Sequence, residues 1–109
     1  MATAYKVLGK SNPSATTLTT LYTCPASTET VISSIVVCNQ AGTSGTYRIA
    51  VRPNGDPIAT EHYLVYDATI AANTTVAYTL GITLDASDVV SVYASSTSFS
   101  FNAFGSEIS

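Results

Sequence analysis

Apolar side chains recur at every second position in several windows of this chain, which is the pattern of a β-strand that buries one face. The clearest windows are residues 46–52, 75–80 and 98–103. The residues between the apolar ones are mostly polar, so each window predicts a strand whose other face is turned outward. The side chains expected to face a core are Tyr47, Ile49, Val51, Val76, Tyr78, Leu80, Phe99, Phe101 and Ala103.

Other windows carry apolar side chains on both faces, namely residues 31–38, 63–66 and 89–93. A strand of this kind lies in the centre of a sheet, or its outer face meets another subunit. Residues 18–23 predict a further strand, and residues 5–8 predict an edge strand.

The segments between these windows have the composition of turns. Residues 12–13 (NP), 24–25 (CP), 42–45 (GTSG) and 53–57 (PNGDP) combine Pro, Gly and Asn, as turns do. Helices are disfavoured, because the chain is rich in Thr, Ser, Val, Ile and Tyr. About eight short strands separated by turns predict an all-β fold, either a two-sheet antiparallel sandwich or a jelly roll.

The length of 109 residues is close to the commonest size of one domain. No long polar, Pro-rich or charged segment divides the chain, so we expect residues 1–109 to form a single β-sandwich domain. Charged residues make up only 10% of the sequence, whereas Thr and Ser together occupy 31 of the 109 positions. Soluble domains usually devote about a quarter of their positions to charges. So little charge indicates a surface covered by hydroxyl groups or hidden against neighbouring molecules, and we expect the chain to assemble.

The formal net charge is −3, and the basic residues Lys6, Lys10, Arg48 and Arg52 form no run. Binding to nucleic-acid phosphates generally needs clustered cations that displace counterions. Direct binding of nucleic acid is therefore not expected. No stretch is long and apolar enough to span a membrane, and the first residues lack the basic-then-apolar order of a signal peptide.

These features predict that the protein is made and folded in a cytoplasm. In that compartment we expect Cys24 and Cys38 to be free, buried thiols. With a single histidine and no second cysteine pair, they do not supply a zinc ligand set.

Residues suited to catalysis are sparse. His62, beside Glu61, could serve as a general base, but no Gly-x-Ser-x-Gly elbow accompanies it, and we favour an ordinary residue at the start of a strand. Asp85 and Asp88 offer two carboxylates where a calcium loop uses several oxygen ligands. We expect them, like Asp56, to cap turns. The sequence therefore predicts a protein that is not an enzyme, with no catalytic, cofactor-binding or metal-binding residues.

Tyrosine is abundant, with seven residues, while tryptophan is absent. Tyrosine suits interfaces because its ring is apolar and its hydroxyl group can form a hydrogen bond. We expect the internal tyrosines to fill the core or an interface, and a face that stacks on sugars is the alternative. The internal tyrosines are Tyr22, Tyr47, Tyr63, Tyr66, Tyr78 and Tyr93. Residues 73–75 (NTT) match the glycosylation sequon, but without a secretory signal they are interpreted as a turn.

Several stretches together resemble small virion structural proteins of tailed bacteriophages, especially phages of cyanobacteria. They are residues 21–26 (LYTCPA), 33–39 (SSIVVCN), 47–51 (YRIAV), 81–84 (GITL) and 104–108 (FGSEI). The likeness rests on the order and spacing of these stretches, and it extends from about Lys6 to the C-terminus.

This resemblance implies a component of a phage particle with no catalytic residues to transfer. The expected function is capsid decoration, in which the protein acts as a cement that stabilises the phage head. The alternative is an adhesion module of the tail, baseplate or fibre that binds a carbohydrate on the host surface. The expected partners are further copies of the chain, with a trimer as the first expectation, and the major capsid protein or other virion proteins.

Overall fold

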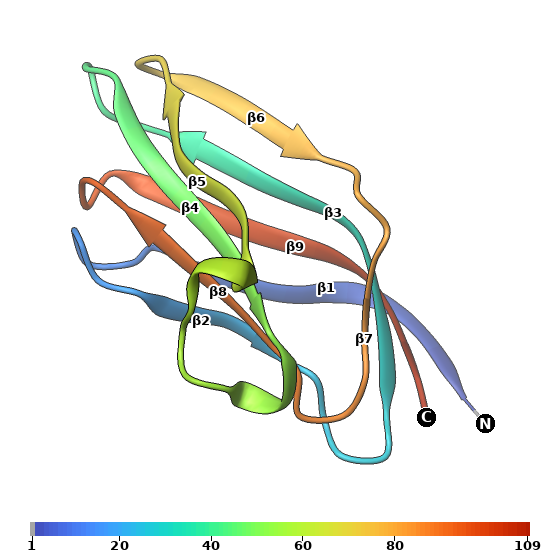
Figure 1. The fold of residues 1–109 in the computed structure, drawn as a ribbon. Coiled ribbons are helices and arrows are strands. Elements are labelled where there is room, and N and C mark those ends of the chain that lie inside the picture. The colour runs from blue at the N-terminus through green and yellow to red at the C-terminus, as the bar shows by residue number, and fades with distance from the viewer. Residues whose placement is uncertain (1) are drawn as a thin grey trace.

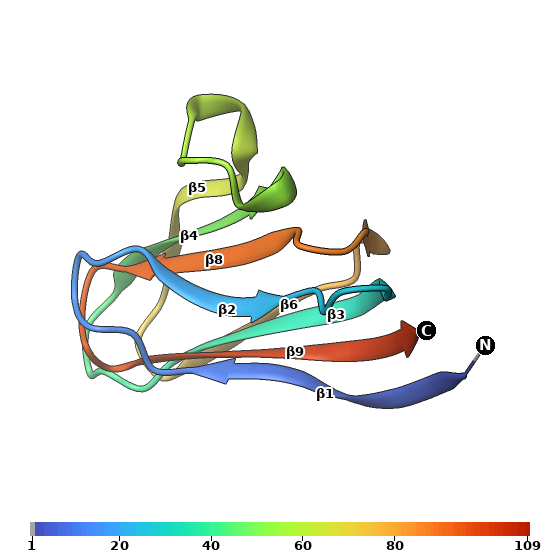
Figure 2. The same cartoon turned by 90° about the horizontal axis from the view of Figure 1, so that it is seen from below.

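The molecule is a two-layer β-structure, as the computed structural model of residues 2–109 shows (Figure 1). Two antiparallel sheets face each other across one core (Figure 2). This confirms the predicted all-β, two-sheet fold. The strands are β1 (Thr3–Ser11), β2 (Thr19–Thr23), β3 (Glu29–Asn39), β4 (Gly45–Arg52), β5 (Tyr63–Ile70), β6 (Thr74–Tyr78), β7 (Ile82–Leu84), β8 (Val89–Ala94) and β9 (Phe99–Ile108).

The connectivity is that of a rolled ribbon. One sheet has the order β1-β9-β3-β6, with β7 also paired to β3, and the other has the order β2-β8-β4-β5. The pairs β1/β9, β2/β8, β3/β6 and β4/β5 are all antiparallel, and they alternate between the two sheets. The chain therefore forms one long antiparallel ribbon, in which β4 and β5 are the innermost pair, and this ribbon is rolled into two layers. This arrangement is a jelly roll, one of the two architectures that the sequence predicts.

Strands β6 and β7 act as one interrupted strand. β7 pairs with the first part of β3 and β6 with its last part, both antiparallel. The ladder breaks at residues 79–81, where Gly81 has a φ of 62°. The prediction that Leu80 continues the inward alternation of Val76 and Tyr78 is therefore wrong, and its side chain is 55% exposed. The sequence pattern does not predict β7.

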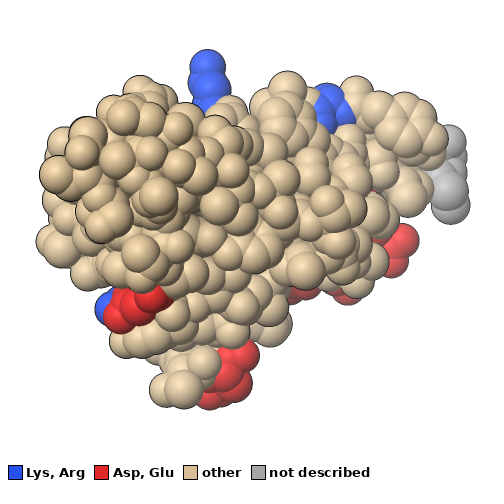
Figure 3. Space-filling view, turned by 90° about the horizontal axis from the view of Figure 1, so that it is seen from above, with Lys and Arg blue, Asp and Glu red and all other residues tan. Residues whose placement is uncertain are grey.

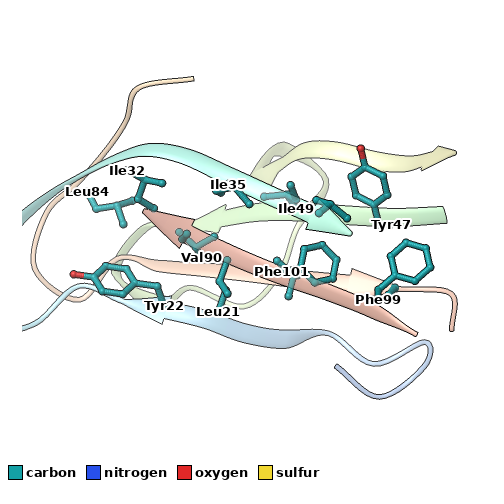
Figure 4. Packing of buried hydrophobic residues seen from close by; sticks show 14 of the residues in the cluster. Leu21, Tyr22, Ile32, Ile35, Tyr47, Ile49, Leu84, Val90, Phe99 and Phe101 are labelled. Carbon is teal, nitrogen blue, oxygen red and sulfur yellow. The ribbon is translucent and has the colours of Figure 1, made fainter. Parts of the chain in front are cut away.

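The core is made by the inward faces of both sheets (Figure 4). Tyr47 lies at one end of it, and its ring centroid is 6.4 Å from that of Phe99 and 6.3 Å from that of Phe101. The Tyr47 hydroxyl group is hydrogen-bonded to that of Tyr78. Apart from Leu80, the residues predicted to face inward are buried in this cluster or packed against it.

The two-sided pattern of residues 31–38 has its reason in the position of β3. This strand lies between β9 on one side and β6 and β7 on the other, so the first of the two alternatives, a central strand, is confirmed for it. Its inward side chains Ile32, Ile35 and Val37 are almost completely buried, while Val36 is half-buried on the outer face. Residues 63–66 belong to β5, which lies at the edge of its sheet, so a central position is wrong for them.

Both cysteines are unpaired, as predicted. Cys24 is buried at the end of β2, with its Sγ atom 3.3 Å from the carbonyl oxygen of Thr28 and 3.2 Å from Oγ1 of Thr30. Cys38 is only half-buried, because its position in β3 faces outward. The prediction that both thiols are buried is therefore correct for Cys24 alone.

A long excursion covers part of the outer face of the four-stranded sheet. It contains the short 3-10 turns η1 (Pro53–Gly55) and η2 (Thr60–His62) and lies over β4 and β8 in Figure 2. Beneath it, Ala50 faces outward as predicted but is fully buried beside Ser91. Arg52 holds the excursion by donating hydrogen bonds to Ser91 Oγ and to the carbonyl oxygen of Asp56.

Candidate functional site

The outer face of the five-stranded sheet carries a group of apolar side chains that the described chain does not cover. Tyr5 and Val7 on β1 are 86% and 57% exposed, and Phe104 on β9 is 38% exposed. The register places Val7 opposite Phe104 and Tyr5 opposite Ser106, which in turn lies opposite Val31. We call Tyr5, Val7, Val31, Val36 and Phe104, which share this side of the sheet, the apolar face.

The rest of this side carries hydroxyl and amide groups, with charge at its two ends. Ser34 and Asn102 lie between the apolar residues, Lys10 lies opposite Asn102, and Glu29 lies opposite Ile108. Figure 3, a view along the edges of the two sheets, shows few Lys, Arg, Asp and Glu residues among the uncharged ones on that side of the molecule. The apolar face can therefore bury surface against another protein without first removing many charges from water.

The opposite side of the molecule carries a compact group of aromatic and charged side chains. The Arg48 guanidinium carbon lies 4.2 Å from the ring centroids of both Tyr66 and Tyr93, and 5.9 Å from that of Tyr63. Its Nε donates to Oδ1 of Asp67 at 2.6 Å. We call Arg48, Tyr63, Tyr66, Asp67 and Tyr93 the tyrosine–arginine cluster.

A β-bulge brings this cluster together. Tyr47 and Ile49 of β4 pair with Ala68 and Val65, so that Tyr66 and Asp67 both lie opposite Arg48. Asp67 has a φ of 51°, a left-handed conformation that Asp tolerates better than most residues. Bulges redirect side chains in this way, and here the result is a carboxylate and an aromatic ring on one guanidinium. The hydrogen bond to Asp67 raises the pKa of Arg48. The guanidinium group is in any case a permanent cation in proteins.

A second polar group lies between the sheets near the ends of β1 and β9. Nζ of Lys6 is 2.6 Å from Oε1 of Glu107, and Tyr22 donates a hydrogen bond to the other oxygen of that carboxylate. Hydrogen bonds from Lys6 and Tyr22 lower the pKa of Glu107. Burial, followed by the hydrogen bond to the Glu107 anion, raises the pKa of Tyr22. This network joins β1, β2 and β9 and has a structural role.

His62 has a structural contact. It is buried at the end of η2, immediately before β5, and its Nδ1 atom accepts a hydrogen bond from the backbone N–H of Ala59 at 3.0 Å. Glu61 beside it is exposed. One ring nitrogen of His62 is thus engaged in holding the turn.

Asp85 and Asp88 cap turns, as predicted. Asp88 accepts hydrogen bonds from the backbone N–H groups of Asn54 and Asp85, and Asp85 accepts one from that of Ala86. Asp56 ends η1, with its N–H donating to the carbonyl oxygen of Pro53. Among residues 2–109, no three His, Cys, Asp or Glu side chains come close enough to hold a metal ion. No helix in that range is long and apolar enough to cross a membrane.

The tyrosines divide between the core and the surface. Tyr22 and Tyr47 are buried, and Tyr78 packs against the core, as the prediction of core filling requires. Tyr63, Tyr66 and Tyr93 instead form the outward cluster around Arg48. The sequence pattern does not identify this cluster, because it depends on the bulge in β5 and on the pairing of β4 with both β5 and β8.

Comparison of the sequence with models of known protein families finds no match, and comparison with curated proteins finds no similar sequence. The functional argument therefore rests on the two surfaces, the apolar face and the tyrosine–arginine cluster.

Proposed function

We propose that this protein is a non-enzymatic structural protein of a virus particle that decorates the capsid and cements it through the apolar face. The observation that carries the proposal is the exposure of Tyr5, Val7 and Phe104 on one side of the five-stranded sheet. A single exposed apolar residue is ordinary, but a group of them on one sheet face is typical of an interaction site.

The physical basis of cementing is that the protein binds the assembled shell in preference to separated shell subunits. A module that contacts neighbouring subunits only in the assembled shell lowers the free energy of the assembled state relative to separated subunits. Apolar area removed from water contributes about 25 cal/mol per Å², before the costs of association and ordering are subtracted. The low charge and the compact jelly roll suit this role, since few ions need desolvation on binding.

The resemblance to phage virion proteins supports the same proposal, together with assembly of the module around a symmetry axis of the shell. We propose a trimer, because each contact then repeats at a threefold axis of the lattice. The major capsid protein is the proposed partner, and the virion is the proposed location. A particle structure in which each copy is isolated from its siblings would contradict the trimer.

An adhesion module of the tail, baseplate or fibre is the second candidate, and the tyrosine–arginine cluster favours it. Copy number per particle distinguishes the two locations. Quantitative mass spectrometry of purified particles should give a copy number comparable to that of the shell subunits if the protein is a decoration. A few copies per particle would place it on the tail and contradict the cement proposal.

A further inference from the structure

A hollow opens beside the tyrosine–arginine cluster, on the side of the molecule opposite the apolar face. It is lined by Thr60 of η2 and by Tyr63 and Tyr66 of β5, with a volume of about 380 Å³. Pockets for small ligands usually measure about 300–1,000 Å³, so this hollow has room for a small ring compound. Its wall consists of two aromatic rings and a hydroxyl group.

The aromatic wall is held in place by its neighbours. The ring of Tyr63 meets that of Tyr66 at 82° with centroids 4.9 Å apart, an edge-to-face contact. Arg48 lies 4.2 Å from the Tyr66 centroid and is itself fixed by Asp67 and by Tyr93. Tyr66 nevertheless remains 59% exposed. A ring that is both fixed and exposed loses little side-chain entropy when a ligand stacks on it.

The charge of the site is balanced. Asp67 accepts from both Nε and Nη2 of Arg48, so the two formal charges offset each other. An anionic ligand would have to compete with Asp67 for the guanidinium group. A neutral ligand with one apolar surface and several hydroxyl groups matches the wall without that competition.

From this geometry we infer that the hollow binds a neutral sugar ring. The apolar C–H face of the sugar stacks on Tyr66, while Thr60 and the tyrosine hydroxyl groups exchange hydrogen bonds with the sugar hydroxyls. This inference goes beyond the cementing function. It concerns a different surface, so the loss of sugar binding would leave attachment through the apolar face unchanged.

The test is an NMR titration of the isolated protein with neutral oligosaccharides of glucose, galactose, mannose and rhamnose. A sialylated oligosaccharide and a proline-rich peptide serve as comparison probes. We expect at least one neutral oligosaccharide to shift signals of the β5 residues. Tyr66→Ala should weaken that binding about tenfold or more, and Tyr66→Phe, which keeps the ring, should retain most of it.

Tyr5→Ala is the matched control, since it removes an exposed tyrosine from the opposite sheet and should leave sugar binding unchanged. Thermal melting of each variant establishes that it is folded. The inference is overturned if no neutral oligosaccharide binds at a concentration of about 10 mM, roughly tenfold above a weak Kd of about 1 mM. Unchanged binding by folded Tyr66→Ala, or preference for the sialylated sugar or the peptide, would equally overturn it.

Discussion

At the scale of single residues, two glycines allow strands to approach more closely than a side chain permits. A Cβ atom on Gly105 would collide with the carbonyl oxygen of Val31, and one on Gly9 would collide with that of Leu21. Gly105 lies where β9 changes register against β3, and Gly9 lies where β1 changes register against β9. The absence of a side chain at these positions is therefore part of how the strands bend together.

Gly105→Ala should destabilise the fold by about 1–3 kcal/mol, because the new methyl group meets backbone that cannot rotate away. Chemical denaturation followed by circular dichroism measures the change. Gly42→Ala is the control, since nothing lies within 4 Å of a Cβ atom there. Its effect should stay within about 0.5 kcal/mol. Equal stability of the Gly105 variant and the original protein would show that β9 and β3 are not packed as described.

Glu107 predicts a specific dependence of stability on pH. Hydrogen bonds from Lys6 and Tyr22 lower its pKa below the usual 4.5, so the folded state favours the ionised carboxylate. The contribution of Glu107 is therefore fully present above pH 4.5 and is lost as the pH falls through the lowered pKa of the folded state. Glu107→Gln should lower stability at neutral pH and reduce the loss of stability on acidification.

Unfolding midpoints measured between neutral pH and about pH 2.5 would reveal this difference, since carboxylates take up protons over that range. Glu61→Gln is the control, because Glu61 is exposed and makes no ion pair within residues 2–109. If Glu107→Gln and Glu61→Gln change the loss of stability at acidic pH equally, the network of Lys6, Tyr22 and Glu107 has no special role.

At the scale of strands and sheets, we expect the side chains of the apolar face to matter more for attachment to the shell than for folding. The double variant Val7→Ser/Phe104→Ser should remain folded and lower the free energy of unfolding by about 1–3 kcal/mol, because Phe104, at 38% exposed, loses buried apolar area while Val7 is mostly exposed. Binding to particles that lack the protein should be lost, because the apolar area of the contact is removed. Co-sedimentation with such particles measures the binding.

Leu64→Ser provides the control for this variant. Leu64 is 48% exposed on β5 in the other sheet, so its replacement changes a similar apolar side chain away from the apolar face. The control should sediment with particles as the original protein does. Loss of binding by Leu64→Ser, with binding retained by the double variant, would assign attachment to the four-stranded sheet instead.

Local alternation predicts many of these elements, and pairing between distant strands explains the rest. β4 and the first half of β9 have regular alternation, and their inward residues Tyr47, Ile49, Phe99 and Phe101 are buried. Residues 104–108 carry no such alternation, and they form a strand because β1 and β3 pair with them on both sides. β7 is similarly imposed by β3.

From the sequence, only the types of residue in the candidate sites could be predicted, and not the places where the fold brings them together. Abundant tyrosine and low charge indicate interface chemistry, but the cluster of Tyr66, Tyr93 and Arg48 depends on a bulge and on strand pairing. Whether Tyr5 and Val7 lie on a covered or an uncovered face likewise depends on the order of the strands. Periodicity along the chain does not contain that order.

At the scale of the whole molecule, the jelly roll presents two different outer surfaces. The five-stranded sheet offers the apolar face, and the four-stranded sheet offers the tyrosine–arginine cluster and the excursion at residues 53–62. We propose that the first surface contacts the shell. The cluster, on the opposite sheet, then faces away from the particle.

The most direct test of the central proposal is to heat particles with and without this protein and to record the temperature at which DNA is released. Attachment of the particles to host cells is measured in parallel. A cement bound through the apolar face predicts earlier DNA release without the protein. It also predicts that heat stability recovers on adding back the original protein but not Val7→Ser/Phe104→Ser. Unchanged heat stability together with lost attachment to cells would contradict this account and favour the tail adhesion module.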